Sequence, residues 1–414
     1  MARMSRRAFL SRSAATALAV SGGVLLSACG KRDATGAAPG AGGPQLASPD
    51  SPVTWPVPAE AGRIADGLAP ERGATLRVYN WTEYIYKKVV QDFEKKYKKY
   101  DVKVQVSTYG NMDEAVAKLR GGQVAFDVLF PTYDYLGKLV QGNFLRPLNH
   151  SYIPNIEQVW PAFQNPWYDQ GWNYSVPYTI YTTGIAWRTD KVKDDIAKLA
   201  NPYEALWDEQ YRGKVGILDD YREAIGMTLL KNGITDLNTA NQDHLNLARD
   251  QLVALAKAVR PRVNTNDYID LPESKTWITQ AWSGDMVNAQ YYMPKGQSAD
   301  VMRYWFPEDG KGPVNSDLIV LLRTGKNPVL GHLFMDHLLD YDVAIDNMSW
   351  NGYQPPQNKI NPTELVKNQE LLPKNLETAT VVPAFFDSGY RYLELPGEVD
   401  DRWHAAWQEF KAGA

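Results

Sequence analysis

Apolar and polar residues follow two different periods along the chain after about residue 73. In some stretches β-prone residues run together as in a strand, and in others apolar residues recur every three or four positions with lysines opposite, as on one face of a helix. These stretches predict, in order, strand 75–79, helix 83–100, strand 101–107, helix 111–121 with Asn111 as its N-cap, and strand 125–131. Strands that alternate with helices in this way are typical of a parallel α/β arrangement.

The rest of the chain continues the mixture of strands and helices. The patterns predict a β-prone run at 174–188, strand 215–218, helix 219–230, a helix from 276 to about Ser283 followed by a strand to 292, strand 316–322, and helical segments at 332–348, 364–371 and 403–411. The part that begins near Gly73 has about 340 residues. Because this is more than a single typical core contains, we expect two lobes.

The first 28 residues have the pattern of an export signal. Arg6 and Arg7 stand before a short, alanine-rich apolar stretch and resemble the twin-arginine signal, and Leu26-Ser27-Ala28-Cys29 resembles the lipobox of bacterial lipoproteins. An uncleaved membrane anchor is the alternative, but the apolar stretch is shorter than a bilayer span needs. We therefore predict that residues 1–28 are removed and that Cys29 carries the lipid.

Composition narrows the possible functions of the exported part. Cys29 is the only cysteine, which excludes an intrachain disulfide, a catalytic cysteine and a thiolate metal site. Removing the signal takes away four arginines and no acid, so the formal charge moves from −4 to −8, which disfavours nucleic acid and mildly favours cations. Residues 29–72 are rich in Gly, Ala, Pro and Ser and poor in apolar residues, and we predict a lipidated flexible linker that does not pack.

The common enzyme signatures are missing from the sequence. It contains no phosphate-binding G-x-x-x-x-G-K-[ST], no zinc-binding H-E-x-x-H, no nucleophile elbow and no dinucleotide fingerprint, and its five histidines are scattered. We therefore expect neither a metal nor a cofactor, and binding without catalysis.

Acidic residues stand beside aromatic residues where predicted strands end. Such pairs are Glu83 with Trp81 and Tyr84, Asp134 with Tyr133 and Tyr135, Asp285 with Trp282, and the acids Asp317, Asp220 and Glu223. An organic ammonium ion is held by charge-assisted hydrogen bonds to carboxylates and by cation–π attraction to aromatic faces. The plain alternative is that the aromatic residues belong to the core and that acids such as Asp220 cap helices. In open α/β sheets ligands bind beyond the carboxyl ends of the strands, which would bring the segments 80–84 and 131–135 together.

Several motifs resemble the polyamine-binding proteins of bacterial ABC importers, the family that binds spermidine and putrescine. The resemblance covers residue 74 to the C-terminus and rests on the segments YNWTEYI (79–85), STYGNMDEAVAKL (107–119), FDVLFPTYDYLGKL (126–139), YSVPYTIYTTGIAW (174–187), LDDYREAIGM (218–227), AWSGD (281–285), NSDLIVL (315–321) and NGYQPPQN (351–358).

This resemblance implies a set of ligand-binding residues. They are Trp81, Thr82, Glu83, Tyr84, Thr132, Asp134, Asp220, Glu223, Trp282, Asp285, Asp317 and Tyr353. Glu83 would bind one amine, and Asp317 falls on the family's central amine-binding aspartate. The sequence departs from the family at Asn315, where an aromatic residue is usual, and at Asp134, which is often a tyrosine or a small residue. Which cation binds therefore remains open.

The resemblance also implies an architecture and a transport role. It implies a two-lobed α/β fold of the periplasmic-binding-protein type II, with the ligand in a cleft between lobe 1 (73–187 and 318–362) and lobe 2 (188–317 and 363–414). The lobes would close on the ligand, and the closed, monomeric protein would deliver it to the permease subunits of an ABC transporter.

Three rival interpretations stay open at this point. A sugar-binding protein of similar build would use the 13 tryptophans for stacking, but the strand ends carry acids rather than amides. Agmatine or a quaternary amine would keep the mechanism and change the ligand. An exported hydrolase would use two carboxylates, such as Asp220 and Glu223, as acid and base, although no second motif supports this reaction.

Overall fold

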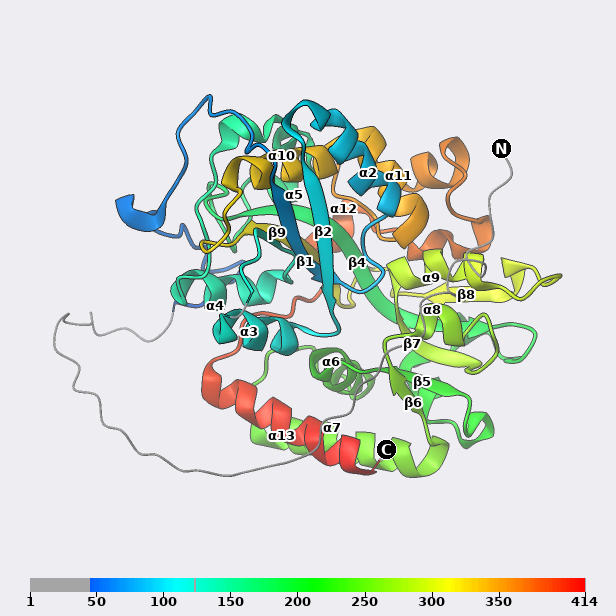
Figure 1. The fold of residues 1–414 in the computed structure, drawn as a ribbon. Coiled ribbons are helices and arrows are strands. Elements are labelled where there is room, and N and C mark those ends of the chain that lie inside the picture. Colours follow the sequence, from blue (N-terminus) through cyan, green and yellow to red (C-terminus); the bar gives the residue numbers. More distant parts are fainter. Residues whose placement is uncertain (1–44, 123, 414) are drawn as a thin grey trace, which may run out of the picture. The chain divides into compact units, whose positions relative to one another are not determined.

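A mixed β-sheet surrounded by helices forms the frame of the molecule (Figure 1). The computed structural model describes residues 45–122 and 124–413, and in this part nine strands are joined in the order β2-β1-β3-β9-β4-β7-β5-β6, with β8 paired to β4. The strands are β1 (Thr75–Trp81), β2 (Lys103–Tyr109), β3 (Val128–Leu129), β4 (Ser175–Arg188), β5 (Val215–Leu218), β6 (Arg262–Asn264), β7 (Ile278–Trp282), β8 (Met302–Trp305) and β9 (Val314–Leu321). The α-helices are α2 (Lys87–Lys96), α3 (Met112–Gly121), α4 (Leu136–Gln141), α5 (Pro161–Gln164), α6 (Tyr221–Lys231), α7 (Gln242–Val259), α8 (Asp267–Asp270), α9 (Ser283–Ala289), α10 (Pro328–Leu339), α11 (Tyr341–Asn351), α12 (Pro383–Ser388) and α13 (Gly397–Gly413).

The predicted parallel unit at the start of the sheet is confirmed. Strand β1 pairs in parallel with both β2 and β3, and helices α2 and α3 connect these strands. Asn111 caps α3, since its Oδ1 accepts a hydrogen bond of 2.9 Å from the backbone amide of Glu114. The carboxyl ends of β1 and β3 therefore open toward the same edge of the sheet, as parallel pairing requires.

Strand β4 links two halves of the sheet. Its first part, to Thr182, pairs with β9, and its second part, from Thr183, pairs with β7 and β8. All of its 14 residues are buried, which explains why the run lacks a clear alternation. We call β1, β2, β3 and β9 the first half and β5 to β8 the second half. The predicted lobe boundaries fall at the end of β4 and inside β9, and the division into two lobes stays a prediction.

Two local predictions are wrong. Residues 276–292 do not form a helix followed by a strand but strand β7 followed by helix α9. Ile278 and Ala281 of β7 are both buried although they lie on opposite faces of the strand, so β7 is covered on both sides and shows no alternation of apolar and polar residues. The predicted helix 332–348 is interrupted at Asp340, whose Oδ1 accepts from the amides of Asp342 and Val343 and starts α11.

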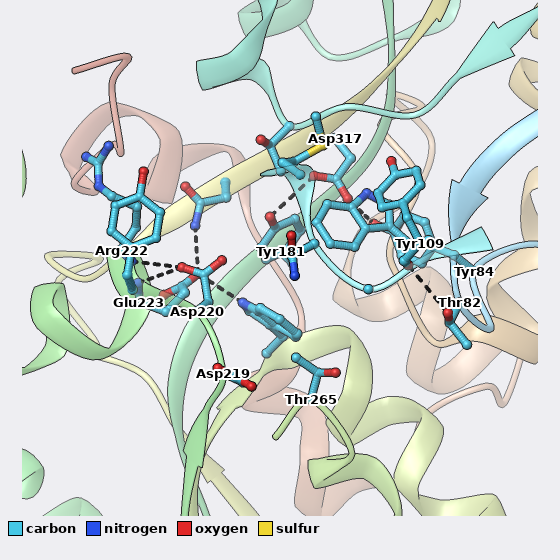
Figure 2. Close-up of a pocket in the computed structure, with 18 of the residues that line it drawn as sticks. Thr82, Tyr84, Tyr109, Tyr181, Asp219, Asp220, Arg222, Glu223, Thr265 and Asp317 are labelled. Atoms are coloured by element: carbon cyan, nitrogen blue, oxygen red, sulfur yellow. Dashed lines mark hydrogen bonds between the residues drawn. The ribbon is translucent and has the colours of Figure 1, made fainter. Parts of the chain in front are cut away.

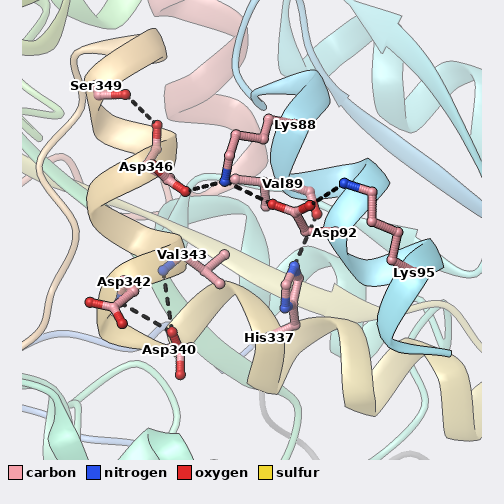
Figure 3. Close-up of polar contacts among 10 residues, drawn as sticks. All are labelled: Lys88, Val89, Asp92, Lys95, His337, Asp340, Asp342, Val343, Asp346 and Ser349. Carbon is pink, nitrogen blue, oxygen red and sulfur yellow. Dashed lines mark hydrogen bonds and ion pairs between the residues drawn. The ribbon is translucent and has the colours of Figure 1, made fainter. Parts of the chain in front are cut away.

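Helix α2 is fixed to α10 and α11 by polar contacts (Figure 3). The Lys88 ammonium donates to Asp92 of the same helix at 2.8 Å and to Asp346 of α11. His337 of α10 makes a 3.0 Å hydrogen bond to the backbone carbonyl of Val89. The lysine face of α2 is solvated, as predicted, but Lys88 also connects it to the neighbouring helix.

The prediction that residues 29–72 form a linker that does not pack is wrong for residues 46–72. Residues 1–44, which include the predicted signal, Cys29 and much of the linker, lie outside the described residues. Residues 46–72, however, pack against the first half of the sheet, and we call them the strap. Val53 and Trp55 are buried, and the Trp55 indole Nε1 donates to the Tyr168 carbonyl at 2.7 Å. At its end, the Glu71 carboxylate accepts from the first amides of α10 at 2.9 Å. A few apolar residues within this Gly- and Pro-rich segment are enough to anchor it. The composition of the segment did not predict that it packs.

We expect Trp55→Phe to lower the free energy of unfolding by about 1.5 kcal/mol, because the substitution removes a buried hydrogen bond and part of a buried ring. Urea unfolding followed by fluorescence would measure this change. Leu68→Ala is the matched control, because Leu68 lies in the same strap with 47% of its surface exposed. If both variants unfold at the same urea concentration as the parent, the strap contributes nothing to stability.

Candidate functional site

One pocket brings together all the residues predicted to bind a ligand. It has a volume of about 520 Å³ and lies where β1, the segment after β3, the start of α6, β7 and β9 come together. Each of the twelve predicted residues, from Trp81 to Tyr353, lines it. The pocket thus receives side chains from both halves of the sheet. Contact of these residues with a ligand stays a prediction.

The end of β1 supplies the first wall of the pocket. The Trp81 indole Nε1 donates to the Phe130 carbonyl at 2.9 Å, which fixes the ring at the pocket margin. Glu83 has φ of 55°, a left-handed conformation that is uncommon outside glycine and often occurs at functional sites. This turn directs Tyr84 inward, where it is buried, and leaves Thr82 exposed. Trp81, Glu83 and Tyr84 thus stand close together in the sequence at a sharp turn of the chain beside the pocket.

Asp317 on β9 lines the pocket among aromatic side chains (Figure 2). Its carboxylate accepts from the hydroxyl groups of Tyr84 at 2.6 Å and Tyr181 at 3.3 Å. The Tyr353 ring stands edge-on to both tyrosines, with centroids 4.8 and 5.6 Å away. Burial raises the pKa of Asp317 to about 7, although the two phenol hydrogen bonds act in the opposite direction. A cation bound at Asp317 would supply the positive charge that the phenol hydroxyl groups do not provide to its carboxylate.

Glu223 in the first turn of α6 organises the opposite wall. Its Oε1 accepts from Thr183 Oγ1 and Trp282 Nε1, each at 2.9 Å, and its Oε2 accepts from the Tyr392 hydroxyl at 3.1 Å. Burial and then the charge of Asp220 raise the pKa of Glu223 to about 8. The carboxyl group therefore orients Trp282 and Tyr392 toward the cavity.

Asn315 connects the two walls. Its Oδ1 accepts from the Tyr133 hydroxyl at 3.0 Å, and its Nδ2 donates to Glu223 at 3.4 Å. An aromatic residue at this position could make neither bond. The departure of Asn315 from the family pattern therefore exchanges an apolar wall for a polar link between the segment after β3 and α6.

Asp220 caps a helix and also faces the pocket, and its contact with a ligand stays a prediction. It caps α6, since its Oδ1 accepts from the amides of Arg222 at 2.9 Å and Glu223 at 3.1 Å, and it also lines the pocket. Burial raises its pKa to about 6, and the nearby charge of Asp134 adds to this rise. The hydrogen bonds from the amides of Glu223 and Arg222 lower the pKa of Asp220, but burial outweighs them.

Asp285 forms the remaining acidic wall, at the start of α9. Burial raises its pKa to about 6, and hydrogen bonds from Asp267 and Tyr353 oppose the rise. Asp267 is also buried, and burial together with the charge of Asp285 raises the pKa of Asp267 well above its usual range. Gly284 makes room for Tyr353, since a Cβ there would lie 2.4 Å from the Tyr353 ring. The neighbouring glycine thus permits the ring to contact the pocket.

Several pocket residues are absent from the predicted set of ligand-binding residues. They include Tyr109, Tyr133, Tyr135, Tyr181, Arg222, Tyr268, Tyr392 and His404. Tyr133 and Tyr135 flank Asp134, and Arg222 stands inside the D-x-R-E motif, so a signal was present for these three. Tyr268 and His404 come from segments without any motif, and Tyr181 lies in the family-like segment 174–187 but beside no acid, so only the fold brings these three residues to the pocket.

Arg222 supports the pocket from behind. Its guanidinium donates to the carbonyl of Leu393 at 2.9 Å and to Asn238 Oδ1 at 2.6 Å, and it lies 5.2 and 4.8 Å from the ring centres of Tyr392 and Trp403. Because these contacts hold the guanidinium, Arg222 fixes the segment that carries Tyr392.

We expect Arg222→Lys to lower the free energy of unfolding by about 2 kcal/mol, because a lysine ammonium reproduces neither the forked hydrogen bonds nor the stacking. Thermal unfolding of the two proteins would measure the loss. Arg212→Lys is the control, since Arg212 is exposed and donates only to backbone carbonyls at the end of α7. Equal melting temperatures for all three proteins would contradict the supporting role of Arg222.

Comparison with known proteins identifies the family. A family model described as bacterial extracellular solute-binding protein matches residues 88–374. The chain belongs to this family. Within the described residues, the solute-binding protein has no helix that is both long and apolar enough to cross a membrane. The sequence resemblance is thus confirmed at the family level.

Individual relatives extend this result. The solute-binding protein is 28% identical over 346 residues to the spermidine/putrescine-binding periplasmic protein 1 of Haemophilus influenzae, covering 82% of this chain and 89% of that one. It is 26% identical over 269 residues to the putrescine/cadaverine-binding protein of Pseudomonas aeruginosa, covering 64% and 74% of the two chains. The solved spermidine/putrescine ABC transporter substrate-binding protein of Streptococcus pneumoniae has the same fold, with a TM-score of 0.63 at 22% identity over 82% of this chain and 99% of that one. The predicted α/β fold of periplasmic binding proteins is therefore confirmed.

Proposed function

We propose that this solute-binding protein captures a linear polyamine in the pocket and delivers it to the permease of an ABC importer. The observation that carries the proposal is the composition of the pocket. Eight acidic residues line it, namely Glu83, Asp113, Asp134, Asp219, Asp220, Glu223, Asp285 and Asp317. Among the described residues that line it, the basic ones are Arg222 and His404, and the Arg222 guanidinium is bound elsewhere.

The pocket is suited to an alkyl chain with ammonium ends. Buried carboxylates without cations are unfavourable, and the raised pKa values of Asp317 and Glu223, about 7 and 8, express this. Ammonium groups would bind these carboxylates with charge-assisted hydrogen bonds, and the rings of Tyr84, Tyr353 and Trp282 would cover the methylene groups between them. The names of the relatives from Haemophilus influenzae and Pseudomonas aeruginosa support a polyamine as the ligand.

Closure of two lobes would couple binding to transport. In this proposal residues 73–187 and 318–362 form one lobe and 188–317 and 363–414 the other. The ligand bridges Glu83 and Asp134 of the first lobe to acids of the second such as Asp220, with Asp317 at the crossing between the lobes. Only interactions that exist in the closed form can drive closure, and carboxylates on both sides of the pocket provide them. The closed protein would then bind the permease subunits as a monomer.

Anchoring at Cys29 completes the proposal. A twin-arginine signal would export the folded chain, and a lipid on Cys29 would keep it at the outer face of the membrane, close to the permease. Labelling with a radioactive fatty acid in a bacterial host would test this part. Label that persists in Cys29→Ser would contradict it.

Isothermal titration calorimetry would test the ligand directly. The full chain is purified, freed of carried-over ligand by partial unfolding and refolding, and titrated with putrescine, spermidine, agmatine, a quaternary amine and maltose at low and moderate salt. We expect one polyamine per protein, with an affinity that falls as salt is added. Binding of maltose alone, or of none of these compounds, would overturn the proposal.

A further inference from the structure

Helix α13 contacts the first half of the sheet through an ion pair. Helices α3 and α4 follow strands β2 and β3, whereas α13 packs on α6 and α7 of the second half (Figure 1). The Lys138 ammonium of α4 donates to Asp400 Oδ2 of α13 at 2.8 Å. In the proposed division Lys138 belongs to one lobe and Asp400 to the other. This ion pair therefore joins the two lobes directly through side chains.

Asp400 is also held from its own side of the contact. Its Oδ1 accepts from the Tyr221 hydroxyl of α6 at 2.7 Å. Although burial raises the pKa of Asp400, the hydrogen bonds from Lys138 and Tyr221 keep it below its ordinary value, so the carboxylate is charged at neutral pH. The side chains of Lys138 and Asp400 are 32% and 15% exposed. Because solvent screens this pair only in part, it contributes more than a fully exposed ion pair.

A second set of contacts lies on the same side of the pocket. The His404 ring of α13 stacks on the Tyr221 ring with the centroids 4.0 Å apart, and His404 Nε2 lies 3.8 Å from Asp113 Oδ2 of α3. The Tyr135 hydroxyl donates to Asp113 Oδ1 at 3.1 Å. These four residues all line the pocket. Side chains from both predicted lobes therefore meet here and form one side of the pocket.

The segment before α13 contacts α4 at another place. Glu394 accepts a hydrogen bond from the backbone amide of Lys138, and its carboxyl group lies so close to α4 that a Cβ at Gly137 would clash with it. The Lys138 ammonium also lies 4.9 Å from the centre of the Tyr135 ring, which keeps it beside the Tyr135 hydrogen bond to α3. The contact between the lobes thus consists of several interactions that support one another.

We propose that the contact of α13 and α6 with α3 and α4 is a latch, which holds the two lobes closed and sets how slowly the ligand leaves. The latch consists of Asp113, Tyr135, Lys138, Tyr221, Asp400 and His404. The inference rests on the proposed function and goes beyond it, because it assigns part of the closure to contacts in which the ligand takes no part. Closure brings the acidic residues of the pocket together, and their repulsion opposes it. The latch offsets this repulsion, and the ligand leaves only after the latch opens.

Lys138→Met tests the latch, because its two possible effects have opposite signs. The charge of Lys138 reaches the pocket, where it lowers the pKa of Asp134. Through charge alone, its removal would favour a bound cation and slow its release. Loss of the latch ion pair should instead accelerate release. We expect spermidine to leave Lys138→Met about fivefold faster than the parent, measured by rapid filtration as release of radiolabelled spermidine into excess unlabelled spermidine.

A double-mutant cycle and a control complete the experiment. If Lys138 and Asp400 act through their ion pair, Lys138→Met/Asp400→Asn should release spermidine no faster than Lys138→Met. Lys88→Met is the matched control, because Lys88 makes ion pairs with Asp92 and Asp346 inside one predicted lobe. Its release rate should stay within about twofold of the parent, since no contact between the lobes is lost.

The outcomes separate the latch from the proposed function. Slower or unchanged release from Lys138→Met would overturn the latch and leave the proposed function intact. Effects of the two substitutions that multiply in the double variant would also overturn it, because the residues would then act independently. If spermidine does not bind the parent, the proposed function itself fails. Lys138→Met decides alone if Asp400→Asn does not fold.

Discussion

Asp317→Asn should weaken polyamine binding about 100-fold at pH 8, while the ligand-free protein unfolds at nearly the same temperature as the parent. The substitution removes a carboxylate of the pocket and with it a charge-assisted hydrogen bond to an ammonium group, which is equivalent to about 2.7 kcal/mol. The ligand-free fold loses little, because the carboxylate is buried and the pKa of Asp317 is raised to about 7. The Tyr84 hydroxyl also keeps its partner Thr179, at 2.5 Å.

Two measurements separate binding from folding in this experiment. Calorimetry with spermidine gives the affinity, and thermal unfolding without ligand gives the stability. Asp309→Asn is the matched control, since Asp309 is exposed and paired with Lys311, and it should change neither quantity. An affinity within threefold of the parent would remove Asp317 from the binding site. A large drop in melting temperature would instead assign it a structural role.

The ligand-free protein should lose stability as the pH rises from 5.5 to 8.5. Burial raises the pKa of Glu223 to about 8, of Asp317 to about 7, and of Asp220 and Asp285 to about 6. Because the folded state holds these protons more tightly than the unfolded chain, their stabilising contribution is complete at low pH and is lost as the pH passes the folded-state values. We expect a decrease in the free energy of unfolding on the order of 4 kcal/mol over this range.

Polyamine binding should change with pH in the opposite sense. Ammonium groups bind carboxylates and not carboxylic acids, so affinity should rise between pH 5.5 and 8.5, and the stabilisation by ligand should rise with it. Urea unfolding at several pH values, with and without spermidine, would measure both trends. The double variant Asp317→Asn/Glu223→Gln should lose more than half of the pH dependence of the ligand-free protein. A ligand-free stability that increases over this range would contradict the raised pKa values.

The sequence predicted the pocket better than it predicted some of the elements around it. Near β1, β7 and β9, the residues expected to bind the ligand stand close together in the sequence. The residue pattern and the family resemblance therefore identified these residues. Tyr181 and Tyr268 come from a fully buried strand and a short helix, where nothing local marks a pocket residue. Strand β7 was mistaken for a helix because burial on both faces removes the alternation that distinguishes a strand.

The strap was missed for a different physical reason. Composition averages over a segment, and most of the strap is indeed polar, proline or glycine. Its attachment depends on a few specific contacts, such as the Trp55 indole with the Tyr168 carbonyl and the Glu71 carboxylate with α10. Such contacts involve residues more than 100 positions away, and no local pattern in the sequence contains them.

The strap also determines at which residue a shortened version of the protein should begin. A fragment that starts at Gly73, just before β1, would include every residue that lines the pocket but would lack Trp55, which holds the Tyr168 backbone. The Tyr168 ring stacks on Tyr133 at 5.6 Å, and Tyr133 lines the pocket. We therefore expect a shortened protein of this kind to bind the ligand with a different affinity from the natural protein. Weak binding by the shortened protein would reflect the missing strap and would not exclude the ligand. Expression should begin at or before Leu46, the residue at which the compact unit starts.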